Sequence, residues 1–232
     1  ACSRAWKELH GLDAMKRGAY TPHVKRGDVL TYGTIIGEVQ EGAFKHYIMC
    51  GSERGKVARV ASRDISLDEP LGEFEDGLEI PGCHEWPVRR PRPYRRKHPP
   101  MTPLVTGQRS IDFLFPLARG GVAIVPGGFG TGKTILEQSI AKFADVDIVV
   151  YVGCGERGNE MADLIAEFEE LEDPWTKRKL TERTVLVVNT SNMPVAAREA
   201  SIYTAVTIAE YYRDMGYHVL FLADSLSRWA EA

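Results

Sequence analysis

The chain has 232 residues, of which 44% are hydrophobic and 26% are charged, and its formal net charge is -3. This length and composition predict one large or two modest domains with a buried core, and the weak net charge excludes a global attraction to nucleic acid or anionic lipid. No apolar run approaches the ~20 residues that a membrane-spanning helix needs, and no basic-then-apolar leader is found at the start, so we expect a soluble protein.

The four cysteines, Cys2, Cys50, Cys83 and Cys154, are scattered and form no C-x-x-C motif. This spacing argues against a metal cluster and favours plain thiols in a reducing cytosol. The sequence starts at Ala1 and stops inside what we predict to be a helix, so we expect a fragment.

The N-terminal third shows short β-branched runs separated by glycine. Residues 6–20 are weakly helical in pattern, residues 64–70 are expected to form a loop, and strands are expected within 24–30, 33–39, 47–49, 55–60 and 71–74. Such runs are typical of short strands joined by tight turns. We therefore predict a small all-β barrel or sandwich-like domain over residues 1–85.

Residues 86–100 contain five prolines and six arginine or lysine residues. Proline excludes a regular helix or a central strand here and favours a stiff, extended linker. The basic side chains can bind RNA or phosphate, but no aromatic residues alternate with them as in a base-stacking surface. A solvated or partner-facing linker is the preferred interpretation, and no nucleic-acid partner is expected.

From residue 101 the pattern becomes that of alternating strands and helices. Strands are expected at 122–125, 148–152, 185–188 and 219–222, and helices at 134–143, 159–170 and 194–215, the last ending before Gly216. Nearly continuous apolar strands with helical crossovers predict an α/β fold with a parallel sheet and helices on both faces. In such a fold the ligand lies at the carboxyl ends of the strands.

A glycine-rich loop matches the phosphate-binding pattern G-x-x-x-x-G-K-[ST] and comprises Gly127, Gly128, Phe129, Gly130, Thr131, Gly132, Lys133 and Thr134. In this pattern the backbone N–H groups and the helix start form an anion site, the lysine reaches the β- and γ-phosphates, and the final hydroxyl ligates Mg²⁺. A chance match in a glycine-rich turn is the alternative, but the expected strand before the loop and the helix after it favour an ATP/ADP site with Mg²⁺. Residues 101–232 are therefore predicted to be a P-loop NTPase domain, truncated on its C-terminal side.

Two carboxylates end predicted strands near this loop. Asp224 ends the run at 219–222, where a carboxylate can contact the Mg²⁺ shell. Glu156 follows the run at 148–152, where it can orient the attacking water; capping of the next helix is the alternative, and it is preferred for Glu160. Arg157 can contact phosphate or form a salt bridge across a subunit interface, and both interpretations stay open.

Three long runs, at residues 153–161, 189–203 and 224–232, resemble the catalytic A subunit of V-type and A-type rotary ATPases. The resemblance extends through residues 86–90 and 104–109 and, less sharply, back to about residue 22. It implies that residues 22–83 form the bulge insertion typical of these A subunits and that the nucleotide-binding domain begins near residue 99. By position it implies phosphate and Mg²⁺ binding by Lys133 and Thr134, a catalytic Glu156, and Asp224 in the second nucleotide motif.

The resemblance also implies partners and location. The B subunit supplies an arginine finger in an alternating hexamer, central and peripheral stalk subunits complete the complex, and the membrane is reached only through an ion-translocating sector that moves H⁺ or Na⁺. The protein would lie on the cytoplasmic side, peripheral to the membrane. Leu226 departs from the family's small residue at that position, and by itself this fragment is expected to have little or no ATPase activity.

Three other functions compete with this one. A flagellar or secretion export ATPase shares the loop and the motif around Glu156, but the β-rich insertion argues against it. A non-catalytic nucleotide-binding or interaction module is disfavoured by Lys133 and Glu156. A hexameric RNA helicase would need an RNA-binding domain, which the sequence does not predict.

Overall fold

The computed structural model describes residues 19–41, 44–51, 55–61, 69–94, 96–128 and 130–232. It divides into two compact units, Ala1–Pro87 and Val88–Ala232. Most of the weakly helical stretch at 6–20, most of the loop at 64–70, Cys2 and Phe129 lie outside the described residues. No disulfide joins the cysteines in the described part of the chain.

Unit 1 consists of two antiparallel sheets. The first has the order β1-β3-β4 and the second the order β2-β5-β6-β7. Their strands are β1 (Tyr20–Pro22), β2 (Val29–Leu30), β3 (Ile35–Glu41), β4 (Phe44–Met49), β5 (Gly55–Val60), β6 (Gly72–Phe74) and β7 (Glu79–Ile80). The prediction of a small all-β unit is confirmed.

The two sheets of unit 1 share one hydrophobic core. Buried side chains from both sheets form a single cluster, which includes Ile36, Ile48, Val57 and Phe74. Burial of such side chains stabilises a fold by about 1.5–3 kcal/mol each. The β-branched runs of the sequence therefore form a sandwich-like arrangement, as the short runs separated by glycine predicted.

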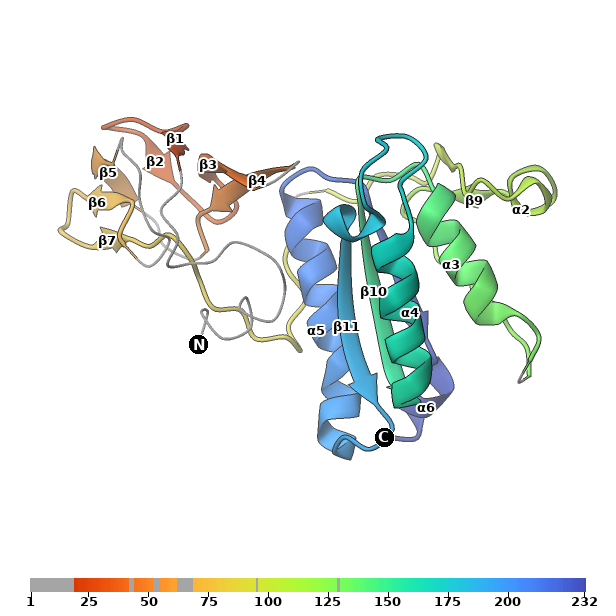
Figure 1. Ribbon diagram of the computed structural model, residues 1–232. Helices are drawn as coiled ribbons and strands as arrows, with labels where there is room; N and C mark the ends of the chain where they lie inside the picture. The colour runs from red at the N-terminus through yellow and green to blue at the C-terminus, as the bar shows by residue number, and fades with distance from the viewer. Residues whose placement is uncertain (1–18, 42–43, 52–54, 62–68, 95, 129) are drawn as a thin grey trace. The chain divides into compact units, whose positions relative to one another are not determined.

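Unit 2 is built on a three-stranded parallel sheet with the order β11-β10-β12 (Figure 1). The strands are β10 (Ile148–Glu156), β11 (Thr184–Thr190) and β12 (Val219–Asp224). All nine residues of β10 are buried, which explains its nearly uninterrupted apolar sequence. These three strands were expected and are confirmed.

Helices cover both faces of this sheet. They are α3 (Lys133–Phe143), α4 (Gly158–Glu170), α5 (Val195–Asp214) and the short α6 (Leu226–Ala230). Val149 and Tyr151 lie in the cluster formed with α3 and α4. Cys154, on the opposite face of the same strand, places its Sγ 3.5 Å from the Oγ of Ser201 on α5. Figure 1 shows the sheet between α5 on one side and α4 with α3 on the other.

Several small elements of unit 2 were not expected from the sequence. They are β8 (Pro103–Leu104), α2 (Arg109–Leu114), β9 (Leu117–Ala118) and the 3₁₀ helix η1 (Leu180–Arg183). Asp112 of α2 accepts hydrogen bonds from the backbone N–H and the hydroxyl of Thr106, at 2.8 and 2.7 Å. This group of elements is joined to the C-terminal end of α3, where Asp145 pairs with Arg119 at 2.7 Å.

The strand predicted at residues 122–125 is wrong. These residues form no strand, and the side chains of Val122 and Ile124 are 94% and 78% exposed. Glycine pairs precede and follow the run, and Pro126 directly after it has no N–H to donate. β-branched residues favour strands only where a neighbouring strand pairs with them, and the described residues give this run no such partner.

The first half of the predicted linker packs against α5 within unit 2. Arg92 is only 3% exposed and forms an ion pair with Asp214 at 2.8 Å, and its backbone N–H donates to Glu210. Arg89 pairs with Glu199 nearer the start of the helix. Arg92 is thus not the solvated side chain that the linker interpretation expected, because two acidic residues of α5 bind it.

Candidate functional site

The carboxyl ends of the parallel strands bring the predicted polar groups together. Glu156 is the last residue of β10 and Asp224 the last residue of β12, and both are 7% exposed. The two strands are neighbours, so their ends meet at one edge of the sheet. The glycine-rich loop leads into α3 at the same edge, which places Thr134 beside Asp224.

The glycine-rich loop is closed by its own side chains. Lys133 Nζ donates to the carbonyl oxygens of Gly127 and Gly128, each at 2.7 Å, and Thr131 Oγ1 donates to the carbonyl of Gly128 at 2.9 Å. Gly132, the residue that precedes α3, has a φ of 82°, a conformation that favours glycine. The ammonium group, a three-donor cation, is thus held at the start of the helix, where the helix dipole also favours anions.

Thr134 and Asp224 form the centre of the site. The hydroxyl of Thr134 donates to Asp224 Oδ2 at 2.7 Å, and the hydroxyl of Tyr151 approaches the same oxygen at 3.3 Å. Burial and the charge of Asp224 raise the pKa of Tyr151, so this phenol stays protonated and can donate. The two residues predicted as Mg²⁺ ligands from sequence therefore lie in direct contact.

Glu156 lies against an arginine that the sequence analysis did not identify. Arg228 of α6 pairs with the Glu156 carboxylate at 3.1 Å and also donates to the carbonyl oxygen of Gly155. Gly155 has a φ of 70°, a backbone conformation that favours glycine, and a Cβ there would lie 2.9 Å from the Nε of Arg198. The signal that could have identified Arg228 is its position four residues after Asp224.

The pKa of Glu156 is raised from 4.5 to about 7. Burial is the largest cause, followed by the hydrogen bond with Glu160 and the negative charge of Asp224, while Arg228 acts in the opposite direction. A carboxylate with a pKa near the working pH is suited to proton transfer, since it is available in both protonation states. Glu160 also lies in the first turn of α4, where a negative charge is favoured by the helix dipole, as the interpretation preferred for it expected.

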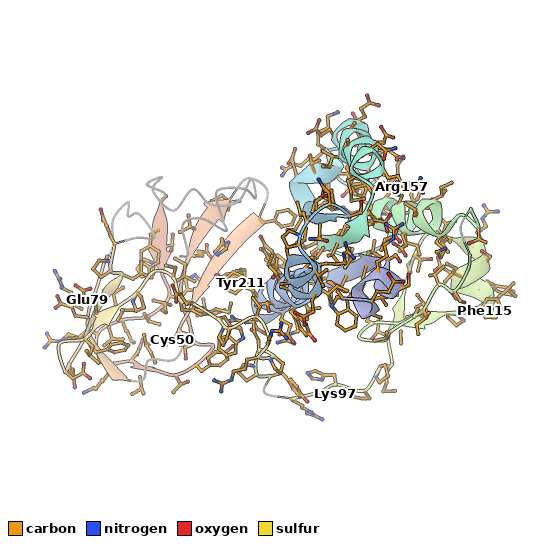
Figure 2. All side chains as sticks on the ribbon, turned by 90° about the horizontal axis from the view of Figure 1, so that it is seen from below. Cys50, Glu79, Lys97, Phe115, Arg157 and Tyr211 are labelled. Atoms are coloured by element: carbon orange, nitrogen blue, oxygen red, sulfur yellow. The ribbon has the colours of Figure 1, made fainter. Side chains whose placement is uncertain are left out.

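Arg157, the residue after Glu156, is exposed. Its side chain is 62% exposed and pairs with Glu160 at 3.9 Å, and Figure 2 labels it beside the first turn of α4. The described residues place it at the surface, and neither of its two predicted roles is decided by this position. Phe115, also labelled in Figure 2, lies at the periphery of unit 2 and is 73% exposed.

A third carboxyl, Glu137 of α3, also belongs to this cluster and was missed from the sequence. Its pKa is raised from 4.5 to about 8 by burial and by the charges of Asp224 and Glu156, with Lys133 opposing them. The signal that could have identified it is helical spacing, because residues three and four positions after Thr134 and Lys133 lie on the same helix face.

The donor set at this edge fits a divalent cation with phosphate. Hydroxyl and carboxylate oxygens are the ligands that Mg²⁺ prefers, and Mg²⁺ usually keeps several waters and binds one or two carboxylates plus phosphate. The Thr134 and Asp224 oxygens lie 2.7 Å apart, and Lys133 supplies positive charge beside them. This arrangement agrees with the predicted roles of these residues, which remain predictions.

Comparisons with known proteins identify both units. Residues 107–232 match the model of the ATP synthase alpha/beta family, nucleotide-binding domain, and residues 9–89 match the barrel-sandwich domain of the ATP synthase alpha/beta subunits. Among the residues that the structure describes, none of the helices is long and apolar enough to cross a membrane.

Curated relatives align over nearly the whole chain. The chain is 56% identical over 224 residues to an A-type ATP synthase A subunit of Methanospirillum hungatei, and 58% identical over 227 residues to the A-type ATP synthase A subunit of Methanothrix thermoacetophila. These alignments cover 96% and 97% of this chain but only 38% and 39% of the relatives. The chain therefore spans about two fifths of the length of the relatives that it matches.

A solved structure gives a more distant likeness. It comes from a study titled "Structural and biochemical analysis of a prototypical ATPase from the type III secretion system of pathogenic bacteria". The TM-score is 0.55 at 29% identity, and the match covers 75% of this chain and 48% of that one.

Proposed function

We propose, because this chain belongs to the ATP synthase alpha/beta family, that it serves in the catalytic A subunit of a V/A-type rotary ATPase. In this function it hydrolyses or synthesises Mg-ATP and couples the reaction to H⁺ or Na⁺ transport. The observation that carries the proposal is the convergence of Lys133, Thr134, Glu156 and Asp224 at one edge of the sheet. Identity near 56% to A subunits, against 29% to the secretion ATPase, favours this function over an export ATPase.

Each residue of the site has a distinct task in this proposal. The loop residues 127–134 and the N-terminus of α3 bind the phosphates, and Lys133 donates to them as a fixed cation. Thr134 and Asp224 hold Mg²⁺, which when bound neutralises the charge that develops on the phosphoryl oxygens. ATP and ADP are the nucleotides that we expect here.

Glu156 acts as the proton acceptor for water. Its carboxylate ends a buried strand, so the backbone holds it firmly, and Arg228 fixes its orientation at 3.1 Å. With a pKa of about 7 it is ionised in a large share of molecules at neutral pH and can accept a proton from water attacking the phosphoryl group. Arg157 is proposed to act at a subunit interface or on phosphate.

The proposed partners follow from the same family. A B subunit completes the site with an arginine finger in an alternating hexamer, and central and peripheral stalk subunits connect the hexamer to an ion-translocating sector in the membrane. The chain lies in the cytoplasmic sector, and no nucleic acid takes part.

The test compares wild type with Glu156→Gln in the intact protein, assembled with its partner subunits. We expect Mg-ATP binding to persist while turnover falls by roughly 10²- to 10⁴-fold, the range for a lost general base. Glu169→Gln is the matched control, because Glu169 is exposed on α4, away from the site. Unchanged turnover in Glu156→Gln would show that Glu156 only ends the strand and that the site is not catalytic.

A further inference from the structure

Glu137 occupies an unusual position on α3. It follows Thr134 by three residues and Lys133 by four, so all three share one face of the helix. Its charge interacts with those of Asp224 and Glu156 at the ends of the neighbouring strands, β12 and β10. The partly buried side chain therefore lies beside the other carboxyls of the proposed nucleotide site.

One oxygen of this carboxyl lacks a protein partner. Oε2 of Glu137 is shielded from solvent and accepts no hydrogen bond from the described residues. The nearby donors are engaged elsewhere, since Lys133 donates to carbonyls of the loop, and Thr134 and Tyr151 donate to Asp224. Leaving a buried polar atom unsatisfied costs about 1–3 kcal/mol, so such an atom calls for an explanation from water, an ion or function.

We propose that Glu137 is a further positioning residue of the nucleotide site: its carboxyl oxygen accepts a hydrogen bond from the water shell of the bound divalent cation and so strengthens the binding of nucleotide with cation over nucleotide alone. This inference rests on the proposed function, because it needs a nucleotide and a cation at this edge of the sheet. It adds an indirect contact to the direct ligands Thr134 and Asp224.

The chemistry of the neighbourhood supports this role. Three carboxyls, Glu137, Glu156 and Asp224, lie near two basic groups, Lys133 and Arg228, so acidic groups are in excess and a further cation is favoured there. Mg²⁺ keeps several of its waters in protein sites, and outer-shell hydrogen-bond partners change metal affinity by about 10- to 100-fold when they are removed. The pKa of Glu137 is raised because burial and the charge of Asp224 outweigh the effect of Lys133, which agrees with a carboxyl beside which a further cation is favoured.

The experiment measures ADP binding to the intact protein by isothermal titration calorimetry, with Mg²⁺ and with Mg²⁺ removed by chelation. The quantity of interest is the dissociation constant of ADP without Mg²⁺ divided by that with Mg²⁺. This ratio reports the coupling between cation and nucleotide. Wild type is compared with Glu137→Gln, which keeps the shape of the side chain, and with the surface control Glu169→Gln. We expect the ratio to fall by about tenfold in Glu137→Gln alone, while the affinity for ADP without Mg²⁺ stays the same or increases.

Each other outcome has a definite meaning. If Glu137→Gln weakens ADP binding equally with and without Mg²⁺, the residue is merely structural and the inference is wrong. If the ratio is unchanged in Glu137→Gln while wild type shows strong coupling, the inference fails and the proposed function stands. If wild type itself binds ADP no better with Mg²⁺, the proposed site fails, and the inference fails with it.

Discussion

Replacing Glu137 by Gln should make thermal stability less sensitive to pH. In the folded chain the pKa of Glu137 is about 8, against 4.5 for an ordinary glutamate. A carboxyl with a raised folded-state pKa contributes stability that is fully present below about pH 4.5 and is lost as the pH rises through about 8. The neutral amide has no such loss, so the variant should gain stability over wild type in the alkaline range.

The size of this gain follows from the shift in pKa. At 1.36 kcal/mol for each pKa unit, the difference between 4.5 and about 8 corresponds to about 5 kcal/mol above pH 8. The side chain is only partly buried, so screening by solvent reduces this to roughly 2–3 kcal/mol. For a chain of this length that gain corresponds to a rise in Tm of roughly 5–10 °C at pH 9 and to little change at pH 5.

Differential scanning calorimetry at pH 5 and pH 9 provides the assay. Comparing Glu137→Gln with wild type at each pH cancels the contributions of other titrating groups, and Glu169→Gln controls for the loss of a surface carboxylate. A difference in Tm that is the same at both pH values would refute the reasoning, because it would show that Glu137 ionises as it does in the unfolded chain.

Two further predictions concern other buried charges. Arg183 donates to carbonyls at the C-terminal end of α3 and pairs with buried Asp173 at 2.9 Å. Replacing Arg183 by Met should lower the free energy of unfolding by about 3–5 kcal/mol, because the buried charge of Asp173 then lacks this cation. Urea denaturation should show a smaller loss for Arg183→Met combined with Asp173→Asn, and equal losses would contradict this. For Glu156, turnover of the assembled protein should rise as the pH passes about 7, because only the ionised base accepts a proton; a flat profile between pH 6 and 8 would count against that role.

Most of the elements of unit 2 could be predicted from strong local patterns in the sequence. The nearly uninterrupted apolar run in β10 predicted a strand buried on both faces, and Gly216 marked the end of α5. Asp224 was expected at a strand end because an apolar run stops there. These features depend on residues close in the sequence, so a sequence analysis can identify them.

Individual side-chain pairs between distant residues, and very short strands, were not predicted. The pairing of Arg228 with Glu156 joins residues 72 positions apart, which local patterns do not encode. β7 has two residues, too few to show an alternating pattern. The run at 122–125 shows the opposite error, since β-branched composition predicted a strand that requires a pairing partner.

The packing of Arg92 on α5 has a practical consequence for work with unit 2 by itself. A gene cut at the end of the predicted linker, near residue 101, would remove this arginine and leave Asp214 and Glu210 without the cation and the N–H group that bind them. The last turns of a 20-residue helix would then keep the pairing of both acidic groups with Arg213 but lose the second cation, and the Tyr211 ring that Arg92 covers would be uncovered. Expression of this unit should therefore begin no later than Val88, where the compact unit itself begins.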